Sequence, residues 1–201
     1  MQGVSGTVQR SPGHVVIEMT DEMLLQAISS GDPSAMHALY ARHHMRVSHF
    51  ILRMMRDVSA AEDLVSQVFL DVWRTAGQFE GRSQVSTWLL SIARFKTLTA
   101  LRQRKYEDID QAAILEIADD AAGPEDLLDR STTGAILRAC IAKLSPAHRE
   151  IITLVYYHEK SVEEVSGIVG IPANTVKTRM FYARKQLADL LRSAGVTSMA
   201  A

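Results

Sequence analysis

Cysteine is almost absent from this chain of 201 residues, and the single one is Cys140. One cysteine excludes a disulfide within the chain, which fits a reducing compartment such as the cytoplasm. Because Cys140 lies inside the apolar run AILRACIAKL, we expect it to be a buried small hydrophobic residue.

Long hydrophobic segments are absent as well. The sequence has no run of 18 apolar residues, so it predicts no transmembrane helix and no membrane insertion. The first 20 residues lack an apolar signal core and carry Glu18, which argues against secretion. We therefore expect a cytoplasmic protein whose hydrophobic content of 47% suffices for real cores.

Motifs of catalytic or metal chemistry are missing too. The sequence contains no Gly-rich phosphate loop, no Cys/His metal spacing and no G-x-S-x-G motif. His43 and His44 are neighbours, which point to different sides of a helix, so we expect surface histidines and not metal ligands. The sequence thus predicts a protein that is not an enzyme and needs no cofactor.

Basic residues are absent from one long stretch. Between Tyr106 and Asp129 there are nine acidic residues and no Lys or Arg. Without those nine, 22 bases face 14 acids, although the net charge of the chain is −1. Two basic clusters stand out, which are Arg94, Lys96, Arg102, Arg104 and Lys105, and Lys177, Arg179, Arg184, Lys185 and Arg192.

Apolar residues recur at helical spacing in the rest of the chain, and no segment alternates with period two. We expect an all-α fold with two small helical domains, residues 20–105 and 126–192, joined by a flexible acidic linker, residues 106–125. Residues 1–19 read as a flexible lead and residues 193–201 as a tail. Helix starts are predicted at Asp32–Pro33 and at Ser59 with Glu62, and the last helix of the first domain at about residues 87–105.

The most informative segment is residues 161–187, whose pattern predicts a helix-turn-helix. Ser161 with Glu164 makes a capping box, and Gly170 ends the first helix. Pro172 stands where the first position of the second helix is expected. The second helix buries Val176, Met180, Ala183 and Leu187. A short helix, a tight turn and a second helix with outward donors are how a protein reads a major groove.

The two blocks together resemble an extracytoplasmic-function (ECF) sigma factor, the two-domain initiation factor of bacterial RNA polymerase. DLVSQVFLDVW at residues 63–73 is similar to the polymerase-binding helix of that family. FEGRSQVSTWLLSIARFKTLTALRQRK at residues 79–105 is similar to its promoter-melting loop and helix. Residues 144–187, from LSPAHREI to ARKQL, resemble the region that reads the −35 element.

The resemblance implies site residues at the matching positions. The −35 element would be bound by Asn174, Thr175, Lys177, Thr178, Arg179, Phe181, Tyr182 and Arg184. The −10 element would be bound and melted by Phe79, Arg82, Ser83, Trp88, Arg94 and Lys96. Core polymerase would be bound by Asp63, Gln67 and Asp71. The chain departs from common family residues at Ser66–Gln67, Phe95 and Tyr182, where Gln-Glu, Asn and Arg are usual.

The physics of strand opening agrees with this reading of residues 79–96. An extruded base needs a stacking surface, and the backbone of the open strand attracts cations. Phe79, Trp88 and Phe95 interleave with basic and polar residues there. The alternative is that Trp88 and Phe95 belong to an ordinary core, since buried aromatic rings are common.

The resemblance also implies partners, namely core RNA polymerase, promoter DNA and an anti-sigma factor. It places the interdomain linker inside the polymerase, where we expect basic walls to be met by Glu107, Asp108, Asp110, Glu116, Asp119 and Asp120. Composition alone favours a solvated tether. Two other functions fit the helix-turn-helix by itself: a transcriptional regulator with an N-terminal sensing or dimerisation domain, and a protein-binding adaptor. A regulator normally reads two half-sites as a dimer, and the sequence offers no heptad seam for one.

Overall fold

The computed structural model describes residues 19–55, 57–110 and 132–196. Every regular element in these ranges is helical, which confirms the all-α prediction. The elements are α1 (Asp21–Ser29), α2 (Pro33–Met55), α3 (Val58–Thr75), the 3₁₀ turn η1 (Ala76–Gln78), α4 (Val85–Asp110), α5 (Thr132–Ala142), α6 (Pro146–Ile152), the π-helical turn η3 (Thr153–Tyr157), α7 (Val162–Val169) and α8 (Ala173–Ser193).

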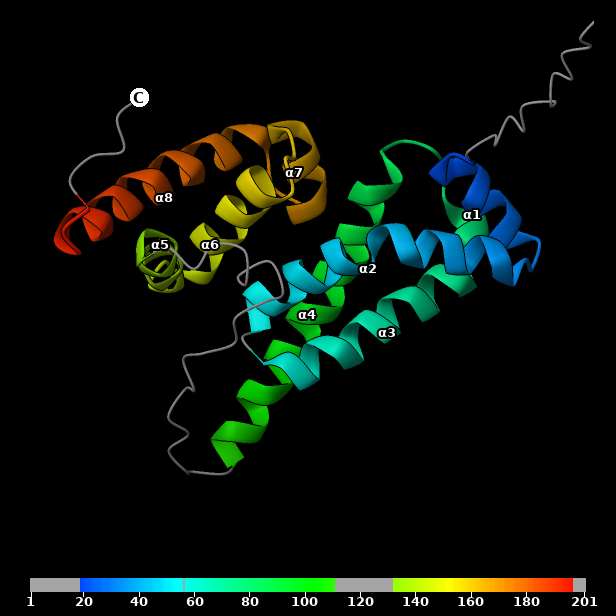
Figure 1. Ribbon diagram of the computed structural model, residues 1–201, viewed down its shortest axis with the longest axis horizontal. Helices are drawn as coiled ribbons and strands as arrows, with labels where there is room; N and C mark the ends of the chain where they lie inside the picture. Colours follow the sequence, from blue (N-terminus) through cyan, green and yellow to red (C-terminus); the bar gives the residue numbers. More distant parts are fainter. Residues whose placement is uncertain (1–18, 56, 111–131, 197–201) are drawn as a thin grey trace, which may run out of the picture.

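Helices α1 to α4 form an N-terminal block. The long helices α2, α3 and α4 pack against one another, and α1 lies across one end against α2 and η1 (Figure 1). Fully buried side chains from three helices meet between them, among them Leu39, Phe50, Val68 and Leu90. Burial of this apolar surface holds the block together and leaves the opposite faces of α3 and α4 for other contacts.

Helices α5 to α8 form a C-terminal block, in which α8 packs on α5, α6 and α7. Its own small core contains Ile141, Leu144, Ile152 and Ala183. Cys140 is buried beside it, as predicted for a small hydrophobic residue. The long α8 therefore carries one apolar stripe inward and keeps its other faces outward.

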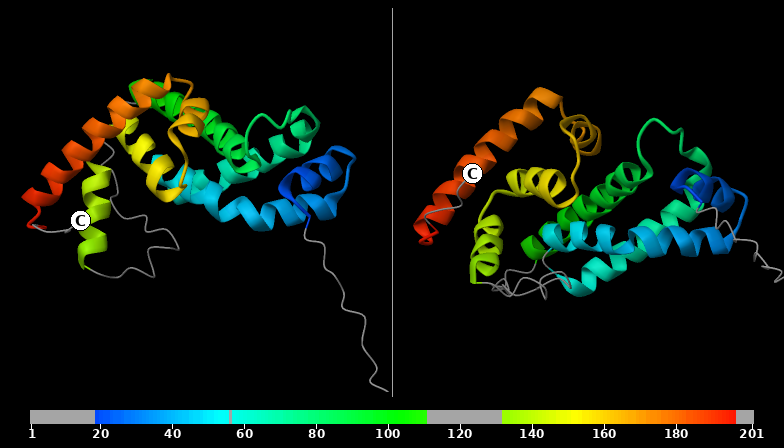
Figure 2. Two further views of the ribbon diagram at one scale, coloured as in Figure 1. Left: turned by 90° about the horizontal axis from the view of Figure 1, so that it is seen from above. Right: turned by 45° about the horizontal axis from the view of Figure 1, so that its top comes forward.

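The two blocks pack on each other through one continuous apolar core. α7 lies against α4, while α6 and η3 lie against α2 (Figures 1 and 2). The main core cluster accordingly joins Phe50 and Leu89 of the first block to Leu154, Val165 and Ile168 of the second. The sequence predicted two domains and gave no sign of this packing, because a helical apolar stripe does not say which helix will cover it.

Helix boundaries differ from the prediction in three places. The cap of α3 is Asp57, whose carboxylate accepts the Ala60 N–H at 3.0 Å, so Ser59 lies inside the helix. Pro172 is the extended residue before α8, and the helix begins at Ala173. α4 spans Val85–Asp110 and so includes the first five residues, 106–110, of the predicted linker. Residues 111–131, on which the linker prediction otherwise depends, lie outside the described residues.

His43 was expected on the surface, and this prediction was wrong. The side chain is buried, and its Nε2 lies 2.6 Å from the Asp21 carboxylate at the start of α1. Asp21 also pairs with Arg42 at 3.0 Å. Because α1 folds across α2, it covers one of the two neighbouring histidines and supplies its polar partner. His44 instead stacks on Tyr40.

The helix-turn-helix forms as predicted. Ser161 Oγ accepts the Glu164 N–H, and the Glu164 carboxylate accepts the Ser161 N–H, which completes the capping box. Gly170 ends α7 in the left-handed region, with φ of 71°. The turn is thus fixed by local interactions that the sequence already contains.

Replacement of Gly170 by alanine tests this turn. A Cβ there would contact nothing within 4 Å, so Gly170→Ala carries only the cost of a left-handed L-residue. We expect a loss of about 1–2 kcal/mol in the free energy of unfolding, measured by urea titration. The control is Gly167→Ala inside α7, where alanine should add up to about 1 kcal/mol instead. Equal effects of the two substitutions would show that the backbone of Gly170 does not matter.

Candidate nucleic-acid interface

The outward face of α8 is polar, basic and aromatic. Val176 and Ala183 are buried, and Met180 and Leu187 are half-buried, as expected for the inward stripe. Of the eight residues predicted to bind the −35 element, Asn174, Lys177, Thr178, Phe181, Tyr182 and Arg184 are exposed, and Thr175 and Arg179 are half-buried. The Phe181 and Tyr182 rings contact edge to face at 5.4 Å between centroids. Six of the eight side chains can thus reach a groove without repacking.

The loop before α4 is supported by a pair of rings. Phe79 and Trp88 are both half-buried, and their ring centroids lie 5.4 Å apart. Arg82 and Ser83 are exposed at the tip, and Arg82 forms an ion pair with Glu80 at 2.7 Å. Phe95 is not a core residue, because 72% of its surface is exposed. The rings at 79 and 88 therefore shape the loop, while the tip and Phe95 face solvent.

Two of the predicted −10 cations are already paired. Arg94 Nε contacts Glu150 Oε1 at 2.7 Å, and this pair crosses from α4 to α6. Lys96 Nζ lies 2.7 Å from an oxygen of Asp71 on α3. Asp71 belongs to the residues predicted to bind polymerase, so residues expected to bind different partners neutralise each other. Basic clustering along a sequence does not show which charges have carboxylate partners.

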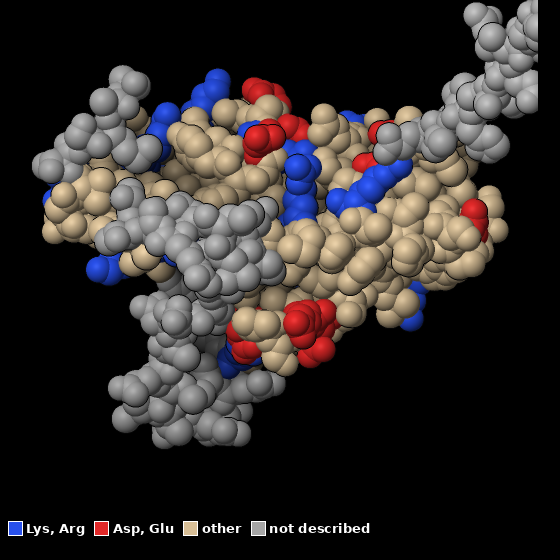
Figure 3. Space-filling model, viewed as in Figure 1, with Lys and Arg blue, Asp and Glu red and all other residues tan. Residues whose placement is uncertain are grey.

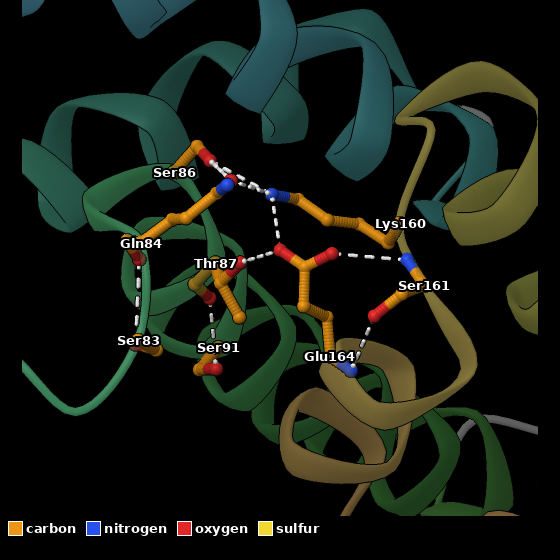
Figure 4. A network of polar contacts seen from close by, with 8 residues as sticks. All are labelled: Ser83, Gln84, Ser86, Thr87, Ser91, Lys160, Ser161 and Glu164. Atoms are coloured by element: carbon orange, nitrogen blue, oxygen red, sulfur yellow. Dashed lines mark hydrogen bonds and ion pairs between the residues drawn. The ribbon is translucent and has the colours of Figure 1, made fainter.

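A buried ionic network joins the starts of α4 and α7 (Figure 4). Glu164 Oε1 accepts hydrogen bonds from Thr87 Oγ1 at 2.6 Å and from Lys160 Nζ at 2.9 Å. Lys160 Nζ also donates to Ser86 Oγ at 2.8 Å and to Gln84 Oε1 at 3.2 Å. The Lys160 side chain is only 4% exposed, so its charge is stabilised by these oxygens in place of water.

The network also keeps its carboxylate ionised. Burial alone would raise the pKa of Glu164, but hydrogen bonds from Thr87, the Ser161 N–H and Lys160 outweigh it and lower this pKa to about 2. Because the pKa is lowered on folding, ionised Glu164 stabilises the folded chain fully at pH values above its ordinary pKa of 4.5. This contribution is lost as the pH falls from 4.5 toward 2. The contact between the blocks is therefore charged throughout the neutral range.

Sequence reasoning missed Glu150 and Lys160. Both are nearly fully buried, which is unusual for these residue types unless they are paired. Glu150 lies within α6 and Lys160 just before α7, and the partner of each on α4 is more than fifty positions away along the chain. No local pattern could have identified either residue.

The predicted polymerase face on α3 is partly open. Asp63 and Gln67 are exposed, and Asp71 is half-exposed in its pair with Lys96. Acidic side chains gather near the start of α3, while Lys and Arg side chains lie along α2 in the middle of the same face (Figure 3). The block thus presents surfaces of opposite charge on neighbouring helices.

Metal and membrane features are not found in the part of the chain that the structure describes. No three His, Cys, Asp or Glu side chains come close enough there to hold a metal ion. None of the described helices is long and apolar enough to cross a membrane.

Comparison with known proteins identifies the family. The chain matches Sigma-70 region 2 over residues 39–106 and Sigma-70 region 4 over residues 134–187. The RNA polymerase sigma factor CarQ of Myxococcus xanthus is 32% identical over 83% of this chain and 95% of its own. The ECF RNA polymerase sigma factor SigW of Bacillus subtilis is 28% identical over 88% of this chain and 99% of its own.

Solved structures agree on the fold. The sigma factor RpoE, in complex with the anti-sigma factor NepR from Bartonella quintana, superposes with a TM-score of 0.68 over 76% of this chain and 94% of its own, at 24% identity. CnrH, in complex with the cytosolic domain of CnrY, superposes with a TM-score of 0.64 over 86% of this chain and 97% of its own, at 22% identity.

A helical fold with a helix-turn-helix and two matched regions in this order defines a transcription initiation factor, not an enzyme. The chain belongs to the ECF sigma factors of the Sigma-70 family. The N-terminal block carries region 2 and the C-terminal block region 4. The family match explains the helix-turn-helix without the two alternative functions, a transcriptional regulator and a protein-binding adaptor.

The pair of Arg94 and Glu150 can be tested by a double-mutant cycle. We expect Arg94→Met and Glu150→Gln each to lower the free energy of unfolding, and the double variant to lose less than their sum. The coupling should be about 1–3 kcal/mol, since the Glu150 side chain is 5% exposed and that of Arg94 22%. The exposed pair of Arg192 and Asp189 is the control, with about 0.2–1 kcal/mol expected. Additive losses at residues 94 and 150 would show that the ion pair does not bind the blocks together.

Proposed function

We propose that this sigma factor binds core RNA polymerase and directs it to promoters by reading two elements. α8 reads the −35 element, the loop of residues 79–84 with α4 engages the opened −10 strand, and α3 docks on the core enzyme. The domain limits that we propose for these roles are residues 20–105 and 126–192.

One observation carries the proposal: the exposed face of α8 in a helix-turn-helix that is capped at both ends of α7. Lys177, Thr178, Phe181 and Tyr182 lie in its N-terminal half, which enters the major groove in such motifs. Arg179 and Arg184 flank them and suit phosphate oxygens. Base contacts give sequence preference, while phosphate contacts give affinity for any sequence.

The −10 assignment is supported by the loop tip and by the surface beside it. Arg82 and Ser83 are exposed, and the ring pair of Phe79 and Trp88 holds the loop in place. Arg94 and Lys96 can reach a DNA strand only after they leave Glu150 and Asp71. Their role therefore depends on a change in how the helices pair.

The remaining partners follow from the family. The relatives named above are RNA polymerase sigma factors, and one solved neighbour is a complex with an anti-sigma factor. We accordingly propose that an anti-sigma factor restrains this chain until a signal releases it. Because bacterial polymerase and promoters are in the cytoplasm, the proposed function places the protein there.

Run-off transcription with purified core polymerase tests the function as a whole. The full chain should produce promoter-specific transcripts with core enzyme and should bind duplex promoter poorly without it. Tight promoter binding by the chain alone, with no transcript on addition of core enzyme, would favour a conventional regulator instead.

The −35 assignment predicts different effects for two cations of α8. Lys177→Ala should relax the preference among −35 variants, since a base contact gives about 1–3 kcal/mol of discrimination. Arg184→Ala should weaken binding to all −35 sequences alike. It should also reduce the slope of log affinity against log salt concentration by about one. Run-off transcription on a panel of −35 variants at several salt concentrations measures both. Unchanged relative activities for Lys177→Ala would contradict the assignment.

The polymerase assignment is best tested at Asp63. This residue is exposed, whereas a change at Asp71 would also break the pair with Lys96. Asp63→Arg should weaken association with core polymerase at least tenfold, which corresponds to about 1.4 kcal/mol, while the helical circular dichroism signal stays unchanged. Glu22→Arg, at an exposed position of α1, is the charge-matched control and should bind normally. Equal affinities of the two variants would exclude Asp63 from the interface.

A further inference from the structure

One buried imidazole lies at the junction of regions 2 and 4 and has no role in the proposed function. His158 follows η3 and is 3% exposed. Its ring meets the fully buried Phe50 ring of α2 at 5.7 Å between centroids. Neither ring nitrogen has a hydrogen-bond partner among the described residues. Region 4 thus places a titratable group in an apolar site that region 2 covers.

The charged groups around this site are nearly all of one sign. α2 supplies Arg46, Arg53 and the buried His49, and the segment of His158 itself supplies Lys160. Arg53 is held in place over the Tyr157 ring, with its Cζ 3.7 Å from the centroid. Figure 3 shows Lys and Arg side chains along α2 on this side of the molecule.

The acids on the neighbouring elements of region 4 do not offset these cations at His158. Glu164 on α7 is bound to Lys160 and Thr87, and Glu150 on α6 is bound to Arg94. Glu159, next to His158, is exposed. A proton on His158 would therefore add a positive charge among cations, in a place from which water is excluded.

We propose that the packing of region 4 on region 2 is a proton-sensitive contact, which opens when His158 takes up a proton. Separation of the two regions brings the imidazole into water and relieves its repulsion by the cations of α2. It also frees Arg94 from Glu150 and Thr87 from Glu164, so the surface of α4 becomes accessible. That last consequence rests on the proposed −10 role of α4, whereas the opening itself does not.

The direction and size of the effect follow from linkage. The pKa of His158 in the packed chain is lowered from 6.5 to about 3. The largest cause is burial, followed by repulsion from Arg53, Arg46, His49 and Lys160. Between these two values the packed chain binds fewer protons than the open chain, so falling pH favours opening. From pH 7.5 to pH 5.5 the ratio of open to packed chains should rise about tenfold. Glu164 stays ionised over this range, because its pKa is about 2.

Single-molecule energy transfer within the full chain tests the proposal. Dyes are attached at Ser59→Cys on α3 and Lys185→Cys on α8, both exposed, in a Cys140→Ser background. The expected result is a tenfold rise in the ratio of low-transfer to high-transfer molecules from pH 7.5 to pH 5.5, with constant helical circular dichroism. An unchanged ratio would overturn the proposal. No DNA or polymerase is present, so this failure is distinct from a failure in transcription.

Substitution of His158 shows whether this residue is the sensor. His158→Phe keeps a ring against Phe50 and cannot take up a proton, so the ratio should stay constant with pH; His158→Leu serves if the phenylalanine variant misfolds. His37→Gln, at an exposed histidine of α2, is the control and should keep the tenfold response. A response that persists without His158, for example through His49, would overturn the assignment. So would a His158 imidazole that titrates near pH 6.5 in the packed wild-type chain, as measured by NMR.

Discussion

The buried ammonium group of Lys160 sets how the two regions are positioned against each other. It is buried between region 2 and region 4, where it donates to Ser86, Gln84 and Glu164 (Figure 4). A buried charge without partners would cost several kcal/mol, so the starts of α4 and α7 must stay close enough to surround it. The same contact orients Glu164, which also caps α7. Glu164 therefore has two roles: it caps the first helix of the helix-turn-helix, and it binds that helix to Thr87 of region 2.

Burial of these charges specifies geometry more than it adds stability. An ion pair such as that of Arg94 and Glu150 offsets most of its desolvation cost and little more. The apolar core between α4, α7 and α2 supplies the attraction, but apolar surfaces tolerate sliding. The ion pair of Arg94 with Glu150 and the hydrogen bonds of Ser86 and Thr87 to Lys160 and Glu164 engage α4 at separate points. They fix one arrangement, because a shifted helix would leave buried charges without partners.

In this arrangement α4 takes part in two contacts: the packing of region 4 on region 2, and the proposed binding of the opened promoter strand. Its N-terminal part and Arg94 face region 4 in the packed chain, and the same stretch is the one that we propose to contact the opened promoter strand. One surface cannot serve both at once. The packed and DNA-bound states therefore compete for Arg94, and any influence that weakens the contact between the regions favours DNA. A buried His158 at the same junction makes acidity one such influence.

Local chemistry explains what could be predicted from the sequence. The capping box of Ser161 and Glu164, the left-handed Gly170 and the apolar stripe of α8 each depend on residues within a few positions. Consequently the helix-turn-helix, the all-α class and the exposure of six of the eight selected side chains of α8 were predicted correctly. The prediction failed where a neighbour far along the chain intervened, as at His43, which α1 covers.

The sequence by itself determined which segments are helical, where the helix-turn-helix lies and how charge is distributed along the chain. Only the tertiary structure decided which of those charges are neutralised and which titratable groups are buried. Arg94 and Glu150 are 56 positions apart, and Thr87 and Glu164 are 77 apart. Hydrogen-bond and apolar periodicities act over a few residues, whereas burial and ion pairing are set by whichever helices the core brings together.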